Sequence, residues 1–331
     1  MLHHGGRLLQ AAQRYQRPAD QWLDLSTGIN PHGWPVPDLA IDHWQRLPDP
    51  DDGLLAAARA YYQCQNLLEV AGSQAAIQAL PRLRSACRVG VPSIGYAEHQ
   101  HAWSLAGHRL QRLDSDQIDQ ALEQLDVLVL INPNNPTGER FSVEQLLEWQ
   151  RKLVMRGGWL IVDEAFIDCQ PEQSLLRFCP RPGLIVLRSI GKFFGLAGIR
   201  AGFVGADLAL LDQLTQYLGP WTLSGPTRQV CKLALADSDW QLKTRCRLRD
   251  DQRRLQALLT ETFVEPVQGT ELFQTLATAD AGELHQRLAR QGILLRRFEQ
   301  PSQIRFGLPQ YEADWQRLQS VLTSLSQISF T

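Results

Sequence analysis

The 331-residue sequence lacks the features of several specialised protein classes. Its longest purely aliphatic run is VLVLI at 127–131, far short of the roughly 20 apolar residues of a membrane span. The start, MLHHGGRLLQ, has no apolar segment of signal-peptide length. The net charge is only −2 and the basic residues are dispersed, so no cationic footprint for nucleic acid is visible. We therefore expect a cytoplasmic protein with neither a membrane nor a nucleic acid as its partner.

The sequence also lacks the cysteine and histidine spacings that are typical of metal sites and of disulfide-rich domains. The six cysteines form no CxxC pair, and the adjacent His3 and His4 have no further ligands at metal-site spacing. No internal repeat or low-complexity tract interrupts the chain. We expect reduced thiols, no metal, and a globular fold of one large domain or two smaller ones.

Three apolar runs in the middle of the chain each end in polar residues. They alternate with amphipathic segments, which is typical of βαβ units and a parallel sheet covered on both faces. The helical pattern lies at 142–156, and the runs with their polar ends are VLVLI–NPNNPTG (127–138), WLIV–DEAF (159–166) and LIVL–RSIGK (184–192).

The spacing of these polar ends predicts one common site. Asn135 to Asp163 is 28 residues and Asp163 to Lys192 is 29, which is about the 30 residues of one βαβ unit. Ligands of open α/β sheets bind beyond the carboxyl ends of the strands. We therefore expect Asn135, Asp163 and Lys192 at one edge of one sheet.

A lysine, a carboxylate and an amide at such an edge fit pyridoxal 5′-phosphate. Its aldehyde needs a lysine and its pyridinium nitrogen needs a carboxylate. The glycines near Lys192 match neither GxxxxGK[ST] nor GxGxxG. Taken singly, each motif has a simpler reading: Lys192 as an exposed lysine, Asp163 as a turn cap and NPNNPTG as a proline turn. Their combination favours the cofactor.

In order and spacing, NPNNPTG, VDEAF and SIGKFFGLAGIRAG resemble the class I/II aminotransferases, the aspartate aminotransferase-like fold type I. The resemblance extends over nearly the whole chain and implies an α/β fold with pyridoxal 5′-phosphate as cofactor. It makes Lys192 the Schiff-base lysine, Asp163 the partner of the pyridine nitrogen and Asn135 a donor to the ring hydroxyl. The remaining implied cofactor residues are Gly72, Ser73, Gln74, Ser189 and Arg200 at the phosphate, Ala165 on one ring face, and His99, or alternatively Tyr96, on the other.

Segments outside this core resemble one branch of the group, the threonine-phosphate decarboxylases of cobalamin biosynthesis. They are HGG (4–6), LDLSTGINPHGWP (23–35), RLPDPDDGL (46–54), DEAFID (163–168) and GPWTLSGP (219–226). Histidinol-phosphate aminotransferases are the alternative. Phe166 favours the decarboxylases, since the aminotransferases usually carry a tyrosine there, although Phe166 also suits plain core packing. Residue types alone leave the choice of reaction open.

A phosphorylated amino acid as substrate requires two anion sites. The resemblance implies Arg305 in QIRFGL for one and Arg296 in GILLRRF for another, with Arg297 as an alternative to Arg296. Which arginine takes which anion stays open. The other implied substrate residues are His4, Asn30 and Asn135.

The same resemblance implies a domain architecture, and the sequence differs from the relatives at a few positions. We expect a large cofactor-binding domain at 41–223 with a mainly parallel sheet, and a smaller α+β domain from 1–40 and 224–331. The fold type also implies a homodimer. Asp52 and Gly53 stand where relatives often place a tyrosine from the other subunit, and Gly28 replaces an asparagine near the substrate.

Overall fold

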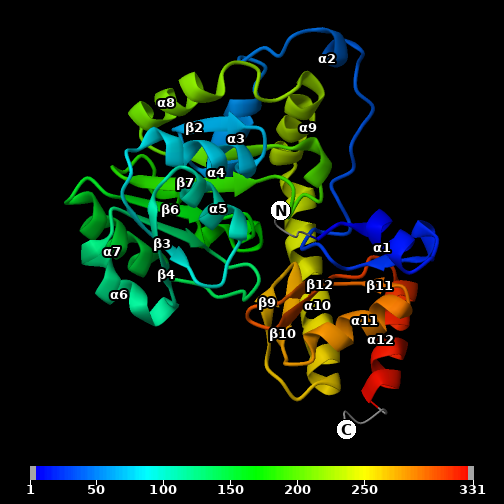
Figure 1. Cartoon of the computed structure of the whole chain (residues 1–331). Coiled ribbons are helices and arrows are strands. Elements are labelled where there is room, and N and C mark those ends of the chain that lie inside the picture. Colours follow the sequence, from blue (N-terminus) through cyan, green and yellow to red (C-terminus); the bar gives the residue numbers. More distant parts are fainter. Residues whose placement is uncertain (1–4, 327–331) are drawn as a thin grey trace. The chain divides into compact units, whose positions relative to one another are not determined.

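The computed structural model describes residues 5–326, and the chain folds into two compact units. We call them the sheet unit, Gly33–Asn135 with Glu139–Leu242, and the terminal unit, which contains the described residues up to His32, Pro136–Gly138 and those from Lys243 onward. Figure 1 shows both units in the colours of the sequence.

A seven-stranded, mainly parallel sheet forms the centre of the sheet unit. Only β8 runs antiparallel to its neighbours, β7 and β2. This confirms the α/β class and the three strands expected from the apolar runs. In sheet order the strands are β2 (Leu67–Val70), β8 (Gly202–Gly205), β7 (Leu184–Ser189), β6 (Trp159–Asp163), β5 (Val127–Ile131), β3 (Arg88–Pro92) and β4 (Arg109–Leu113).

Three helices of the sheet unit, α7, α8 and α9, begin after a side chain that caps a free backbone N–H group. Ser142 and Asp207 accept from the backbone of Gln145 and Leu210, respectively. The helices are α2 (Asp42–Gln45), α3 (Leu54–Tyr62), α4 (Ser73–Ala79), α5 (Ala97–Leu105), α6 (Ile118–Ala121), α7 (Val143–Val154), α8 (Leu208–Leu218) and α9 (Gly225–Ala236).

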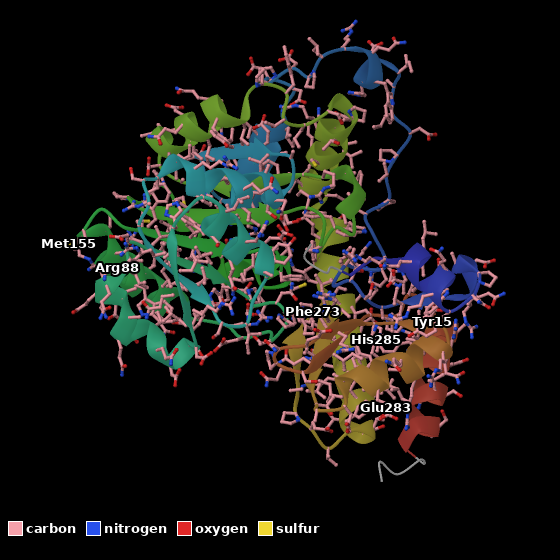
Figure 2. The ribbon with its side chains drawn as sticks, viewed as in Figure 1. Tyr15, Arg88, Met155, Phe273, Glu283 and His285 are labelled. Carbon is pink, nitrogen blue, oxygen red and sulfur yellow. The ribbon has the colours of Figure 1, made fainter. Side chains whose placement is uncertain are left out.

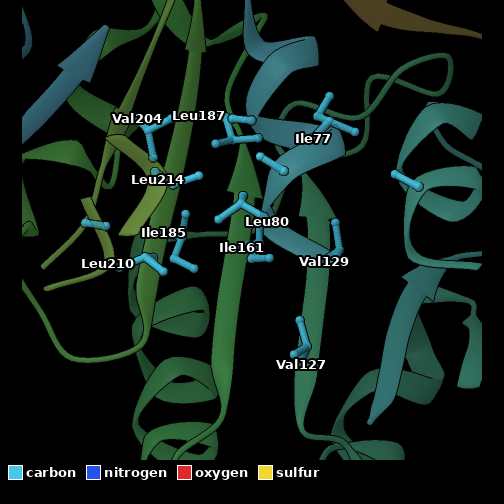
Figure 3. Close-up of a cluster of buried hydrophobic side chains, with 14 of the residues drawn as sticks. Ile77, Leu80, Val127, Val129, Ile161, Ile185, Leu187, Val204, Leu210 and Leu214 are labelled. Carbon is cyan, nitrogen blue, oxygen red and sulfur yellow. The ribbon is translucent and has the colours of Figure 1, made fainter. Parts of the chain in front are cut away.

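One large hydrophobic cluster of the sheet unit lies between the strands and the helices α4, α5 and α8. Figure 3 shows Ile77 of α4 and Leu214 of α8 beside strand residues such as Ile161 and Leu187. All five residues of β5 are buried, as expected for a strand covered on both faces. The unbroken apolar runs are therefore explained by packing on both sides.

The sheet unit reaches further along the chain than residue 223. Arg228 of α9 is buried, and its guanidinium bonds to Asp52 at 2.8 Å and to Glu69 at 2.6 Å. Residues 224–242 therefore group with the sheet unit, as do residues 33–40, rather than with the C-terminal third.

The terminal unit contains a four-stranded antiparallel sheet and a short parallel pair, β1 with β11. The order in the larger sheet is β12, β13, β10, β9. The strands are β1 (Leu23–Asp24), β9 (Val267–Thr270), β10 (Phe273–Ala277), β11 (Ile293–Leu294), β12 (Arg296–Phe298) and β13 (Gln303–Gly307). The helices are α1 (Leu8–Arg14), α11 (Ala281–Arg290) and α12 (Glu312–Ser326), with α10 (Ser238–Thr262) entering from the sheet unit. Figure 2 labels Phe273 of β10 and His285 of α11.

Among the described residues, no helix combines the length and apolar character that crossing a membrane requires.

Two turn glycines of the sheet unit test how tightly its backbone is packed. Gly183 and Gly157 both have a positive φ, +69° and +66°. A Cβ on Gly183 would lie 2.5 Å from the Gly158 carbonyl oxygen, whereas one on Gly157 meets nothing within 4 Å. We expect Gly157→Ala to cost about 1–2 kcal/mol from the left-handed backbone alone. Gly183→Ala should cost roughly 1–3 kcal/mol more, from crowding.

Urea titration followed by tryptophan fluorescence measures both free energies of unfolding. Equal losses for the two variants would contradict this account of the packing.

Candidate functional site

Three parallel strands bring their carboxyl ends to one edge of the sheet. Asp163, the last residue of β6, pairs in register with Ile131 of β5 on one side and Leu187 of β7 on the other. The backbone N–H of Asn132 donates to the Asp163 carbonyl at 2.9 Å. The chain segments that follow β5, β6 and β7 therefore start side by side, as the 28- and 29-residue spacing predicted.

The Asp163 carboxylate is buried, with 3% of the residue exposed, and is held at both oxygens. Its Oδ1 accepts from the backbone N–H of Ala165 at 3.1 Å. Its Oδ2 lies 2.9 Å from Nε2 of His99, which is buried on α5. With the proton on Nε2, His99 donates to the carboxylate. His99 is therefore hydrogen-bonded directly to Asp163. The rings of Tyr96 and His99 pack edge to face, with their centres 6.3 Å apart.

Lys192 follows β7 in a loop that two phenylalanines anchor. Phe193 and Phe194 are fully buried, and the Phe194 ring stacks on Trp240 with an interplanar angle of 12°. Lys192 is itself only half-buried, and its Nζ lies 5.5 Å from the centre of the Phe166 ring. Phe193 and Phe194 therefore fix the loop in the core, while the Lys192 side chain lies over the ring of Phe166.

The residues that the resemblance assigns to the cofactor phosphate lie where α4 begins. Gly72 has a φ of +71°, and a Cβ there would lie 2.7 Å from Nη2 of Arg200. Gly202 of β8 pairs in register with Ser189, and a Cβ on Gly202 would lie 2.7 Å from the Ser73 backbone nitrogen. The Arg200 guanidinium therefore lies against Gly72, and Gly202, the register partner of Ser189, packs against the backbone at the start of α4.

Gln74, also expected at the phosphate, has a side chain engaged elsewhere. Its Nε2 donates to Glu98 at 2.8 Å, and its Oε1 accepts from the Tyr96 hydroxyl at 3.3 Å. Any role of Gln74 at a phosphate therefore falls to its backbone N–H.

Asn135 sits in a loop that a neighbouring asparagine closes. Asn132 donates to the Phe141 carbonyl at 3.2 Å and accepts from the Phe141 N–H at 2.9 Å. Asn134 donates to the Ile94 carbonyl at 2.9 Å. Asn132 and Asn134 therefore bond to neighbouring backbone groups, and Asn135, which the resemblance assigns to the cofactor, is half-buried in the same loop.

A buried ionic cluster behind Asp163 is absent from the sequence-based expectations. Arg188 of β7 bonds to Glu164 at 3.3 Å and, very closely, to Asp168, and all three are essentially inaccessible. Tyr61 donates to Asp168 at 2.8 Å. Burial raises the pKa of Glu164 to about 6. Burial opposes the charge of Arg188, yet Asp168 and Glu164 raise the pKa of that guanidinium above its usual range.

In the terminal unit, strand register separates the two neighbouring arginines of β12. Arg296 lies directly opposite Arg305 of β13, so the two side chains share one face of the sheet. Arg297 pairs with Ile304 in register, lies on the other face and bonds to Glu299 at 3.2 Å. Of the two alternatives, Arg296 is therefore the one beside Arg305.

The Arg305 guanidinium is buried among aromatic rings. It lies 5.1 Å from the Phe273 ring centre and donates through Nη2 to the Ser26 carbonyl at 2.9 Å. Burial first, and then the Arg296 charge, lower the pKa of Arg305 to about 9. A concentration of positive charge in a buried place of this kind suits a bound anion.

Asn30 and His4 are the two remaining residues that the resemblance assigns to the substrate. Asn30 is buried, and its Oδ1 accepts from the His32 N–H at 3.0 Å and from Arg247 at 3.4 Å. His4 lies outside the described residues. Within the described residues, no group of three or more His, Cys, Asp and Glu side chains is placed to hold a metal ion.

Residues 37–318 match the family described as aminotransferase class I and II. The chain belongs to this family of pyridoxal-phosphate-dependent enzymes.

Within the family, curated relatives of one kind match along nearly the whole chain. The threonine-phosphate decarboxylase of Pseudomonas aeruginosa is 51% identical over 327 residues, 99% of each chain. That of a Sinorhizobium species is 37% identical and covers 97% of this chain and 98% of its own. Among solved structures, histidinol-phosphate aminotransferase from Sinorhizobium meliloti, in complex with pyridoxal-5′-phosphate, has a TM-score of 0.82 at 19% identity, over 98% of this chain and 99% of its own. The last similarity shows the fold.

The ionic cluster behind Asp163 makes a stability prediction. Removing the Arg188 guanidinium leaves the buried carboxylates of Glu164 and Asp168 without their cationic partner. Arg188→Met should therefore lower the free energy of unfolding by about 3–5 kcal/mol. The matched control is Arg177→Met at an exposed position, with an expected effect within about 0.5 kcal/mol. Urea titration gives both values. A loss for Arg188→Met no larger than that of the control would show that the cluster does not hold this part of the fold.

Proposed function

We propose that this chain binds pyridoxal 5′-phosphate and decarboxylates L-threonine O-3-phosphate. The products are CO2 and (R)-1-amino-2-propanol O-2-phosphate, a building block of cobalamin. In this reaction the bond from Cα to the carboxylate breaks, and a proton takes the place of CO2. A cytoplasmic homodimer is part of the proposal.

The observation that carries this proposal is the 51% identity to a threonine-phosphate decarboxylase over 99% of both chains. The histidinol-phosphate aminotransferase with the same fold is 19% identical, which supports the fold and not the reaction. Phe166, in place of the tyrosine usual in aminotransferases, points the same way.

The residues at the sheet edge fit the cofactor. A carboxylate held by two donors suits a protonated pyridine nitrogen, and the half-buried lysine nearby suits the aldehyde. Gly72, Ser73, Ser189 and Arg200 suit a phosphate, since the Arg200 guanidinium lies against Gly72, directly before the first residue of α4, and a guanidinium is a strong phosphate donor. When bound, pyridoxal 5′-phosphate supplies an electron sink for the pair left on Cα.

The protein's own contribution is to hold charges and protons in place. Asp163 would hold the protonated ring nitrogen of the bound cofactor, and the N–H of Ala165 and His99 Nε2 fix its two carboxylate oxygens. Asn135 is assigned to the ring hydroxyl, with Ala165 and His99 at the ring faces. The buried Arg188 cluster supports the backbone on which Asp163 lies.

The anions of the substrate are assigned to the arginines of the terminal unit. A phosphorylated amino acid carries a carboxylate and a phosphate, and Arg296 and Arg305 share one face of their sheet. Guanidinium forks suit both groups. His4, Asn30 and Asn135 complete the assigned substrate residues.

One assay with two substrates tests the reaction. The loaded enzyme should release CO2 from L-threonine O-3-phosphate without any 2-oxo acid. It should transfer little amino group from histidinol phosphate to 2-oxoglutarate. An Asp163→Asn protein serves as the control: its carboxamide keeps the shape but loses the charge, so CO2 release should fall strongly while cofactor stays bound.

Efficient amino transfer with no CO2 would contradict the decarboxylase proposal and leave the aminotransferase alternative.

A further inference from the structure

A third arginine belongs with Arg296 and Arg305 in the terminal unit. Arg7 stands at the start of α1, directly after Gly5 and Gly6. The Gly6 N–H donates to Ser26 Oγ at 2.8 Å. Ser26 also offers its carbonyl to Arg305 at 2.9 Å. The segment that carries Arg7 and the buried Arg305 thus contact the same residue.

This segment is held closely against Ser26. A Cβ on Gly5 would lie 2.2 Å from the Ser26 carbonyl oxygen, so only glycine permits the approach. The Ser26 side chain is fixed in turn, since its hydroxyl donates to Asp24 at 2.6 Å. The position of Arg7 therefore depends on the contacts of Gly5 and Gly6 with Ser26.

Packing of α1 against the rest of the terminal unit also fixes the position of Arg7. Ala11 lies in a buried cluster with Trp22, Ala289 and Leu294. Leu294 ends β11, two residues before Arg296. The helix that begins after Arg7 is therefore docked on the segment that leads into β12.

The charges of the three arginines act on one another. After burial, the Arg7 charge is the influence that lowers the pKa of Arg296, and Arg296 acts in the same way on Arg305. A guanidinium stays protonated at neutral pH. The contact of the Arg7 segment with Ser26, which also accepts from Arg305, and the register of Arg296 with Arg305 thus bring three positive charges into one part of the terminal unit. The free energy of their repulsion falls when an anion binds near them.

We infer that Arg7 is a specificity-determining residue, and that the cluster of Arg7, Arg296 and Arg305 selects a phosphate monoester over a singly charged ester. The inference rests on the proposed function for the identity of the substrate. A phosphorylated amino acid carries one carboxylate charge and about two phosphate charges at neutral pH. Three guanidiniums match this total, whereas two would leave the phosphate partly uncompensated.

A pair of ligands that differ in charge and little in shape tests the inference. O-phospho-L-serine carries the doubly charged ester, and L-serine O-sulfate carries a singly charged one. Isothermal titration calorimetry with the full-length, cofactor-loaded chain measures both dissociation constants. In the wild type the phosphate should bind more tightly. In Arg7→Gln its affinity should fall by roughly 10- to 100-fold, the loss of a charge-assisted contact, while that of the sulfate falls much less.

Two further variants control for charge and position. Arg7→Lys keeps the charge and should keep most of the preference for phosphate, even if Arg7→Gln folds poorly. Arg297→Gln removes a guanidinium from the same strand as Arg296 but from the opposite face, and should leave both affinities unchanged. A phosphate-to-sulfate preference that is unchanged in Arg7→Gln, or lost equally in Arg297→Gln and Arg7→Lys, would overturn the inference.

Turnover by the loaded enzyme separates this inference from the proposed function. An Arg7→Gln enzyme should show a raised KM for L-threonine O-3-phosphate with a smaller change in kcat. Decarboxylation with an unchanged KM would refute the role of Arg7 and leave the proposed function standing. If the wild type releases no CO2 while phosphate binding still depends on Arg7, the proposed function is refuted and the role of Arg7 stands.

Discussion

The parallel pairing of β5, β6 and β7 is the constraint on which the candidate site depends. Because these strands run in the same direction and in register, Asp163 lies beside Ile131, the last residue of β5, and beside Leu187, close to the end of β7. A slip of one residue in β6 would turn the carboxylate to the other face. The buried, apolar character of the strands fixes their register, so the same residues that form the core also position the chemistry.

Around this edge, the sheet unit surrounds polar groups with fixed partners. Asp163 is held at both oxygens, and Glu164 and Asp168 share Arg188. Buried charges are costly without partners, and each of these has one. The arrangement leaves the carboxylate of Asp163 oriented before any ligand arrives, which reduces the reorganisation that binding requires.

Much of the site could be predicted from the sequence because its motifs are local. The polar residues that follow each strand are contiguous with it, so NPNNPTG, DEAF and SIGK indicated the edge of the sheet at which they lie, while their chemistry stays a prediction. The His99–Asp163 bond was different: it joins α5 to β6 across 64 residues. The sequence suggested His99 for a ring face, but no local pattern reveals which atom its Nε2 meets.

The Arg188 cluster and the choice between Arg296 and Arg297 needed three-dimensional pairing. Arg188 reads in the sequence as the polar end of a strand, and only packing shows that it is buried between two carboxylates. Arg296 and Arg297 are adjacent and chemically identical. The register of β12 against β13 separates them, because it sets which one faces Arg305. The bounds of the units also depended on tertiary contacts, through Arg228.

Chemical mapping of the cofactor tests the central claim, that Lys192 at this sheet edge is the residue to which pyridoxal 5′-phosphate bonds. The chain has only four lysines, at 152, 192, 232 and 243, so borohydride reduction and peptide mass spectrometry give an unambiguous answer. Our account predicts a pyridoxyl group on Lys192, and none in a Lys192→Ala protein treated in the same way. A reduced adduct of equal yield on Lys152, Lys232 or Lys243 would contradict it.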